Sequence, residues 1–149
     1  MEVVYIAGCW DLFHIGHLNV LEKAKALGDV LVVGVNTDEF MMSHKGKSVI
    51  PFEQRIAIVR ALRCVDIAIP HRDFKDLRGF KEYGVTIRAI GANHGKYEGE
   101  RNHQVQLREL GIPIVVLPRT PNISTRQIRE KCSELCRRNP SSGNVPQIS

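Results

Sequence analysis

One continuous apolar run, Val30–Val35, constrains the fold of this chain more than any other feature. A strand buried on both faces is apolar throughout, whereas a strand with one solvent-exposed face alternates apolar and polar residues. Strands of the first kind occur in parallel sheets that helices cover on both sides. The run therefore predicts an α/β protein with a parallel sheet.

Four other short runs have strand composition, and helical patterns separate them. The five predicted strands are Val3–Ala7, Val30–Val35, Val65–Ile69, Val85–Ile90 and Ile114–Leu117. A last helix is expected after the fifth strand, with Ile128, Cys132 and Leu135 facing inward. This alternation implies a Rossmann-like, doubly wound sheet of five parallel strands with helices on both faces.

The length and charge of the chain limit its organisation and partners. One domain is expected over residues 1–138, followed by a disordered tail over 139–149 that is rich in Ser and Pro. No run approaches the roughly 20 apolar residues of a membrane span, and no leader pattern opens the chain, so a cytoplasmic protein is expected. The basic residues are dispersed, which favours a phosphorylated small molecule over nucleic acid.

The decapeptide Gly8–His17 joins the first strand to the first helix and is the strongest candidate site. Its histidines, His14 and His17, lie in the first turn of the predicted helix. Unpaired N–H groups and the helix dipole favour an anion there, and two imidazoles on one face add donors. A phosphate site is therefore predicted. Zinc bound by both histidines and Cys9 is the main alternative, although no further His or Cys ligand lies near in sequence.

Three other polar segments follow strand ends, where ligands bind in parallel α/β sheets. They are Asn36–Lys47, Gly91–Asn102 and Pro118–Thr125. The first contains two candidate phosphate clamps, Lys45 and Lys47. The last ends in Ser124, which also matches a helix cap with Gln127, so capping alone is an equal explanation for it.

The same segments carry a family resemblance. Its most specific parts are Trp10–His17, Thr37–Phe40, Glu53–Arg55 and Arg119–Thr125. On them the chain resembles the HxGH nucleotidyltransferases, and among these the cytidylyltransferase family that acts on glycerol-3-phosphate and related compounds. The likeness spans roughly residues 2–136, and the combination of HxGH with a distant Arg-Thr-x-x-Ile-Ser-Thr segment is specific.

The resemblance implies a reaction: transfer of CMP from CTP to a phosphorylated alcohol or polyol, with release of pyrophosphate. The second pKa of a phosphate monoester is about 6, so such an acceptor is anionic at neutral pH and needs no general base. Catalysis would then rest on positioning and on stabilising charge. A homodimer and bound Mg²⁺ are also implied, with Asp11 as the expected metal ligand.

The resemblance also assigns roles to particular residues. Expected catalytic residues are His14, His17, Lys45, Arg55 and Arg119. Expected nucleotide-binding residues are Gly8, Cys9, Trp10, Asp11, Gly16, Lys47, Gly91, Asn93, Thr120, Ile123, Ser124 and Thr125. Expected acceptor-binding residues are Asp38, Asn93, His94 and Arg101, with Lys96 nearby, although a plain surface loop would explain residues 91–102 equally well.

Two alternatives for the function remain at this point. Cys9, Asn36 and the pair Lys45-Gly46 resemble adenylyltransferases that form ADP-heptose, which implies ATP and a sugar phosphate instead. A nucleotide-binding module without turnover is the other alternative, against which the intact histidine pair argues. Asn122 stands where relatives carry glycine, and asparagine tolerates the left-handed conformation that glycine would supply.

Overall fold

The computed structural model describes residues 1–139, and it contains one five-stranded sheet in the order β3-β2-β1-β4-β5. All neighbouring strands are parallel. The strands are β1 (Val3–Gly8), β2 (Val30–Asn36), β3 (Ile67–His71), β4 (Ile87–Gly91) and β5 (Ile114–Leu117). The Rossmann-like α/β prediction is therefore confirmed.

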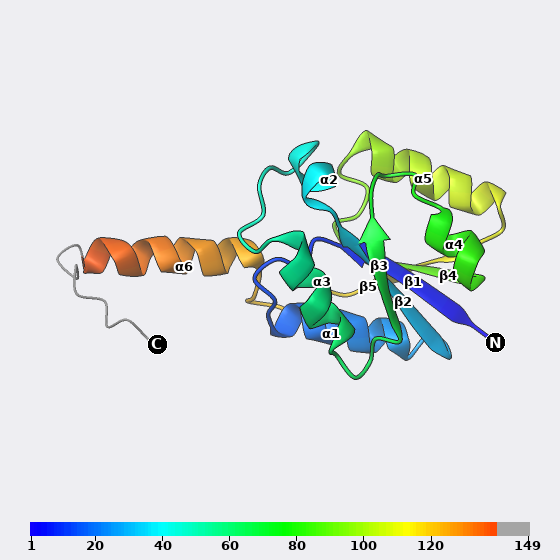
Figure 1. Ribbon diagram of the computed structural model, residues 1–149, viewed down its shortest axis with the longest axis horizontal. Helices are drawn as coiled ribbons and strands as arrows, with labels where there is room; N and C mark the ends of the chain where they lie inside the picture. Colours follow the sequence, from blue (N-terminus) through cyan, green and yellow to red (C-terminus); the bar gives the residue numbers. More distant parts are fainter. Residues whose placement is uncertain (140–149) are drawn as a thin grey trace.

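Helices cover both faces of the sheet (Figure 1). They are α1 (Ile15–Lys25), α2 (Asp38–Met42), α3 (Phe52–Arg60), α4 (Arg78–Tyr83), α5 (Glu98–Glu109) and α6 (Thr125–Arg138). The helices α1 and α3 lie on one face, and α4 and α5 lie on the other. Among residues 1–139, no helix is long and apolar enough to cross a membrane.

The core consists of two layers, one on each side of the sheet. Leu21 of α1 and Val59 of α3 pack with Val33 in one layer. Phe80 of α4 and Leu107 of α5 pack with other strand residues in the second layer. Every residue of β2 after the first is buried, as expected of a strand covered on both faces.

Three elements differ from the sequence-based boundaries by two residues or more, and one of them is β4, which begins at Ile87 instead of Val85. Strand β3 starts at Ile67 and includes Pro70, which a ladder tolerates here because β3 is an edge strand. Helix α5 starts at Glu98, inside the segment expected to be a loop. Its first turn is polar and therefore shows no apolar period, but the Glu100 side chain accepts a hydrogen bond from the backbone N–H of Tyr97 at 3.1 Å, which caps the helix.

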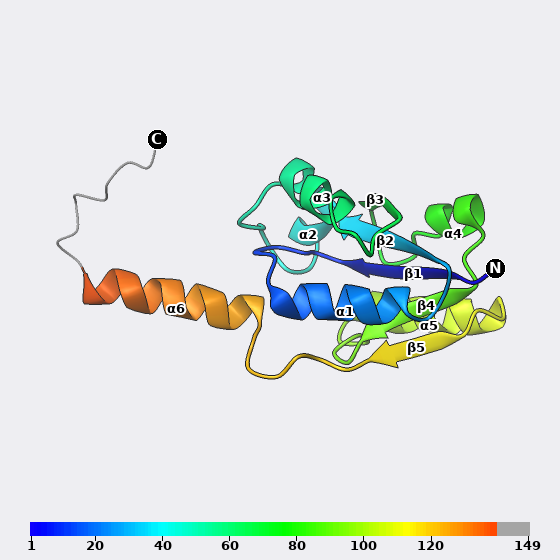
Figure 2. The same ribbon diagram turned by 90° about the horizontal axis from the view of Figure 1, so that it is seen from below.

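Helix α6 extends away from the rest of the molecule in both views (Figures 1 and 2). None of its residues is buried, so the prediction that Ile128, Cys132 and Leu135 face inward was wrong. Their helical spacing is real, but only Ile128 is half-buried, and Cys132 and Leu135 are exposed. Ion pairs four residues apart, such as Arg126–Glu130, support the exposed helix. The predicted tail lies outside the described residues, except for Asn139 at the end of α6.

The fold also determines where a ligand can bind. In the sheet, β2 and β3 lie on one side of β1, and β4 and β5 lie on the other side. The loops that leave β1 and β4 therefore diverge and open a crevice at the carboxyl ends of these strands. The decapeptide Gly8–His17 lies at this crevice because it follows β1 directly.

Candidate active site

His14 and His17 hold each other in one arrangement at the start of α1. Nδ1 of His14 accepts a hydrogen bond from the backbone N–H of Gly16 at 3.0 Å, and Nδ1 of His17 accepts one from the N–H of His14 at 3.2 Å. The two rings stack with centroids 3.8 Å apart. Because both Nδ1 atoms are acceptors, each neutral ring carries its proton on Nε2. The pair therefore supplies two preorganised N–H donors.

Burial keeps this pair neutral in the free protein. Burial, and to a smaller extent the neighbouring His14, lowers the pKa of His17 to about 4. Burial also lowers the pKa of His14. At neutral pH the pair thus provides hydrogen bonds, and full positive charge at the site comes from lysine and arginine.

Gly16 makes room for the histidine pair. A Cβ atom at this position would lie 2.8 Å from Cε1 of His14 and 3.2 Å from a methyl group of Ile123. Both distances are shorter than ordinary van der Waals contacts. The glycine of the HxGH motif is therefore needed for the His14 ring to fold back over the first turn of α1.

Replacing Gly16 by alanine is expected to lower kcat about 10-fold or more while changing the melting temperature little. The added methyl group pushes the His14 ring away from its backbone donor, but alanine also favours the helix, which offsets part of the strain. Steady-state kinetics and thermal unfolding of the variant test this. Unchanged kcat would show that the His14 ring needs no fixed position.

Two cavities flank the histidine pair. The Trp10 cavity, of about 750 Å³, is lined by the residues after β1, by the loop after α2 and by the start of α6. The Arg119 cavity, of about 440 Å³, is lined by the start of α1 and by the segments that follow β4 and β5. His17, Lys45 and Thr125 line both cavities. A ligand in one cavity is therefore adjacent to a ligand in the other.

The structure brings most of the predicted site residues to these cavities. The Trp10 cavity includes Gly8, Cys9, Trp10, Asp11, His17, Lys45 and Lys47. The Arg119 cavity includes His14, Gly16, Gly91, Asn93, His94, Arg119, Thr120, Ile123, Ser124 and Thr125. Ser124 also caps α6, since its hydroxyl accepts from the N–H of Gln127 at 3.1 Å. Asn122 adopts the expected left-handed conformation, with φ of 63°.

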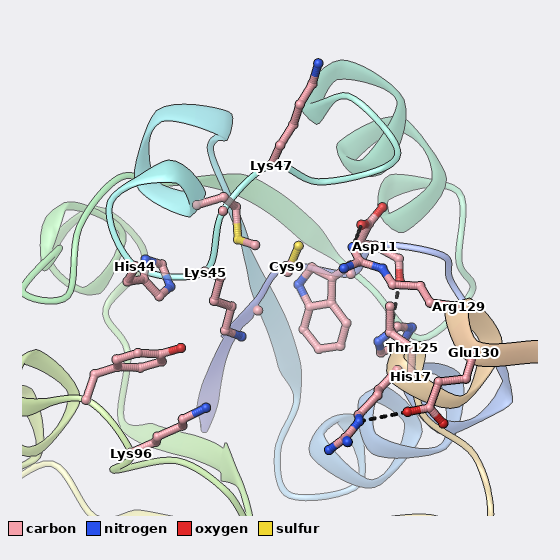
Figure 3. Close-up of a pocket in the computed structure, with 16 residues that line it drawn as sticks. Cys9, Asp11, His17, His44, Lys45, Lys47, Lys96, Thr125, Arg129 and Glu130 are labelled. Carbon is pink, nitrogen blue, oxygen red and sulfur yellow. Dashed lines mark hydrogen bonds and ion pairs between the residues drawn. The ribbon is translucent and has the colours of Figure 1, made fainter. Parts of the chain in front are cut away.

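The two candidate clamps, Lys45 and Lys47, differ in direction (Figure 3). The amino group of Lys45 points into the Trp10 cavity, as does that of Lys96 from the loop before α5. The side chain of Lys47 points away from them. Lys45 is therefore the better placed of the two to hold a phosphate.

Asp11 is not free to bind a metal ion. Its Oδ1 accepts from the backbone N–H groups of Leu12 and Ile50 at 3.1 and 2.9 Å, and its Oδ2 accepts from the N–H of Val49 and from Arg129 at 2.8 and 3.0 Å. The side chain is 3% exposed. These four donors occupy the carboxylate, so the expected Mg²⁺ ligand instead ties the decapeptide to a neighbouring loop and to α6.

Arg55 and Asp38 are also engaged within the protein, contrary to their predicted contacts with substrate. Arg55 is 1% exposed and donates to the carbonyl oxygens of Ile50, Cys9 and Asn36. Its remaining nitrogen donates to Asp38 at 2.7 Å. The guanidinium group therefore fixes the backbone beneath the site, and both residues have a positioning role.

Arg101 also differs from its predicted role. It lies exposed on α5 and donates to the carbonyl oxygens of Gly95 and Lys96 at 2.8 and 3.0 Å. It thereby braces the loop that carries Lys96. His94, by contrast, lines the Arg119 cavity, and Gln104 contacts its Nδ1 at 2.8 Å.

Cys9 does not have the properties of a zinc ligand. Burial raises the pKa of its thiol, whereas zinc binds the thiolate. In the described chain, no group of three or more His, Cys, Asp or Glu side chains is arranged to hold a metal ion. Cys9 instead lines the Trp10 cavity as a neutral, half-buried side chain.

Three charged residues of α6 that line the site were not predicted. Arg126, Arg129 and Glu130 of α6 line the Trp10 cavity, and Figure 3 shows Arg129 and Glu130 on the side opposite Lys45. Arg129 holds Asp11, and the Thr125 hydroxyl next to it in the first turn donates to the carbonyl of Asp11 at 3.2 Å. The available signal was the position of Arg129 and Glu130, three and four residues after Arg126 in the helix that Ser124 caps, which places them on one face.

Stability is expected to fall steeply below pH 6.5. Burial lowers the pKa of His71 to about 3, and that of His17, His94 and His103 to about 4. The unfolded chain binds these protons near pH 6.5, whereas the folded chain does not, so the stabilisation is complete above that pH and is lost as the pH falls toward 4. Each histidine contributes up to about 1.4 kcal/mol per pH unit in this window.

Urea unfolding at pH 7.5, 6.0 and 5.0 measures this loss. A His103→Phe variant removes one of the buried imidazoles, so its free energy of unfolding should change less steeply with pH. An equal free energy of unfolding at pH 7.5 and 5.0 would contradict the burial of neutral histidines.

A Rossmann-like sheet with two histidines of an HxGH motif at the first helix N-terminus, between two cavities at the carboxyl edge, defines a nucleotidyltransferase. The family described as Cytidylyltransferase-like matches residues 5–131, and the chain belongs to this family. The confirmed resemblance thus spans nearly the whole of the described fold.

Several known proteins are similar to this chain. Glycerol-3-phosphate cytidylyltransferase of Bacillus subtilis is 33% identical over 137 residues, which cover 91% of this chain and 100% of that protein. A probable ethanolamine-phosphate cytidylyltransferase of Encephalitozoon cuniculi is 36% identical over 129 residues, covering 86% of this chain and 40% of that protein. The crystal structure of a lipopolysaccharide core biosynthesis protein from Thermoplasma volcanium has a TM-score of 0.67 at 28% identity, covering 80% of this chain and 97% of that one.

Proposed function

We propose that this protein transfers CMP from CTP to a phosphorylated alcohol and releases pyrophosphate. The observation that carries the proposal is the position of His17 and Lys45, which line both the Trp10 cavity and the Arg119 cavity. A reaction that joins two phosphates needs donors and positive charge where the two ligands meet. The family and the glycerol-3-phosphate and ethanolamine-phosphate cytidylyltransferases among the relatives support the same reaction.

In the proposed step, an oxygen of the acceptor phosphate attacks the α-phosphorus of CTP. The new P–O bond forms as the bond from the α-phosphorus to the oxygen bridging to the β-phosphorus breaks, and pyrophosphate leaves with that electron pair. The acceptor oxygen is already deprotonated at neutral pH, so no residue must remove a proton. The protein contributes alignment and charge stabilisation.

Residues of this chain have distinct roles in the step. The Nε2–H groups of His14 and His17 donate to oxygens around the α-phosphorus, where negative charge builds up. Lys45 holds the acceptor phosphate against the nucleotide. The nucleotide binds in the Arg119 cavity, where it contacts Arg119, Ser124 and the start of α6. In this arrangement the donors are fixed before the substrates bind, which is the main source of catalysis.

The role of Mg²⁺ and the oligomeric state of the protein are also part of this proposal. Because Asp11 is fully engaged, Mg²⁺ would enter bound to the triphosphate oxygens and would neutralise part of their charge. The homodimer and the cytoplasmic location stay predictions from the sequence. Light scattering of the purified protein during gel filtration tests the dimer.

A pyrophosphate-release assay with purified protein and Mg²⁺ tests the function. CTP and ATP are each combined with glycerol-3-phosphate, phosphoethanolamine and a heptose phosphate. The proposal expects release with CTP and a phosphorylated alcohol, and release only with ATP and the sugar phosphate would support the adenylyltransferase alternative. Tight binding of CTP without release from any pair would indicate a nucleotide-binding module.

A further inference from the structure

A third cavity, of about 70 Å³, lies next to the two that flank the histidine pair. It is lined by Asn36 from β2, His71 from β3, Arg88 from β4 and His103 from α5, and we call it the Arg88 cavity. Lys45 lines this cavity as well as the other two. The Arg88 cavity therefore adjoins the point where the two phosphates would meet.

Arg88 is a buried charge, and Glu100, whose carboxylate lines the same cavity, accepts hydrogen bonds from the N–H groups of Gly95 and Tyr97 instead of pairing with it. Its side chain is 3% exposed, and in the described part of the chain it makes no ion pair. Its Nη1 donates to the carbonyl of Ala89 at 2.7 Å, and its guanidinium carbon lies 5.3 Å from the centre of the Tyr5 ring. Its Nε has no partner. Burial lowers the pKa of Arg88 to about 10, so the group stays charged at neutral pH.

Two other residues of the Arg88 cavity also carry buried polar atoms without a hydrogen bond. Oδ1 of Asn36 lacks a donor, and both ring nitrogens of His103 lack partners. Buried polar atoms are nearly always paired, so three such residues around one cavity indicate that a ligand completes them. None of the three takes part in the proposed phosphoryl transfer.

The missing partners specify one chemical group. Nε of Arg88 needs an acceptor, Oδ1 of Asn36 needs a donor, and a neutral imidazole such as His103 needs one of each. A hydroxyl group supplies one donor and also accepts, so the two or more hydroxyl groups of a polyol supply enough donors and acceptors for all three residues. An ammonium group only donates, so it offers no acceptor to Nε of Arg88 or to the N–H group of His103, and a trimethylammonium group neither donates nor accepts.

We propose that the Arg88 cavity receives the hydroxylated end of the acceptor, so that the protein uses polyol phosphates and rejects amino-alcohol phosphates. This inference rests on the proposed function, and it selects among acceptors that the function leaves open. The small volume limits the hydroxylated end to a few carbon atoms. Arg88, Asn36 and His103 are then specificity-determining residues.

Two acceptors of nearly equal size test the proposal. Hydroxyethyl phosphate and phosphoethanolamine differ only in their terminal group, a hydroxyl in one and an ammonium in the other. With CTP and Mg²⁺, kcat/KM for the full-length protein should favour hydroxyethyl phosphate about 100-fold, since a buried polar site discriminates strongly against an unmatched group. Equal or better use of phosphoethanolamine would overturn the inference and leave the proposed function intact.

Variants show whether Arg88 causes the preference. Arg88→Met keeps the length of the side chain and should reduce the preference to about 10-fold or less, whereas Arg108→Met, on the exposed face of α5, should keep it. Asn36→Asp adds a carboxylate to the cavity and should improve kcat/KM for phosphoethanolamine. If Arg88→Met does not fold, the Asn36→Asp result decides. An unchanged preference in a folded Arg88→Met protein contradicts the proposal.

A binding measurement separates this inference from the proposed function. Hydroxyethyl phosphate should raise the melting temperature of the wild-type protein, and phosphoethanolamine should raise it less. This readout does not require turnover, so it decides the inference even if no acceptor releases pyrophosphate. Equal shifts with both compounds, or no shift with either, would overturn the inference.

Discussion

The His17→Ala variant is expected to lose about 10²- to 10³-fold in kcat, the loss typical of removing one preorganised donor to a developing negative charge. Affinity for CTP should change much less, because the donor is most important when charge accumulates on the α-phosphate. Pyrophosphate release gives kcat, and equilibrium dialysis with CTP gives the dissociation constant.

The control for this prediction is His17→Asn. The imidazole of His17 also accepts the N–H of His14, so alanine removes a structural hydrogen bond together with the donor. An asparagine amide supplies both an acceptor and a donor, and it should recover part of kcat. Equal losses of kcat and CTP affinity in the alanine variant would show that His17 acts in binding only.

The Lys45→Met variant is expected to lose about 100-fold or more in kcat/KM, since one full charge is removed from the junction of two anionic ligands. Lys47→Met is the matched control, because Lys47 belongs to the same loop and its side chain points away from the amino groups of Lys45 and Lys96 (Figure 3). Its kcat/KM should change less than about threefold, as is usual for a solvated charge.

Salt dependence provides a second measurement for Lys45. The wild-type KM for the acceptor should rise with ionic strength, and the rise should be weaker in Lys45→Met. A larger loss in Lys47→Met than in Lys45→Met would mean that the loop closes differently around bound substrate.

Much of the fold followed from local patterns. The all-apolar run of β2 predicted a strand covered on both faces, and the alternation of strands and helices predicted the doubly wound sheet. Helical periodicity did not predict correctly which face of α6 is buried, because burial depends on packing against other elements. The stripe Ile128, Cys132 and Leu135 has the spacing of a buried helix face, but spacing does not reveal whether the chain supplies a surface to bury it.

In the candidate site, too, the sequence predicted some residues correctly and others not. The HxGH pair and Lys45 were found because their positions relative to strand ends define them. Asp11 and Arg55 were assigned to metal and substrate because their charges suit those ligands, whereas the fold uses both charges to hold backbone groups. Arg88 was missed because it lies within a β-strand, and only the three-dimensional structure shows that it is buried and makes no ion pair with another described residue.

The position of Trp10 has a practical consequence. It is the only tryptophan of the sequence, it is 6% exposed, and its ring lies 5.6 Å from that of His17 in an edge-on arrangement. Its indole N–H donates to the carbonyl of Gly34 at 3.0 Å, which holds the ring against the sheet beside the cavity that it lines. The intrinsic fluorescence of the protein therefore comes from one fixed point at the site, and protonation of His17 or arrival of a triphosphate should change its intensity without any added label.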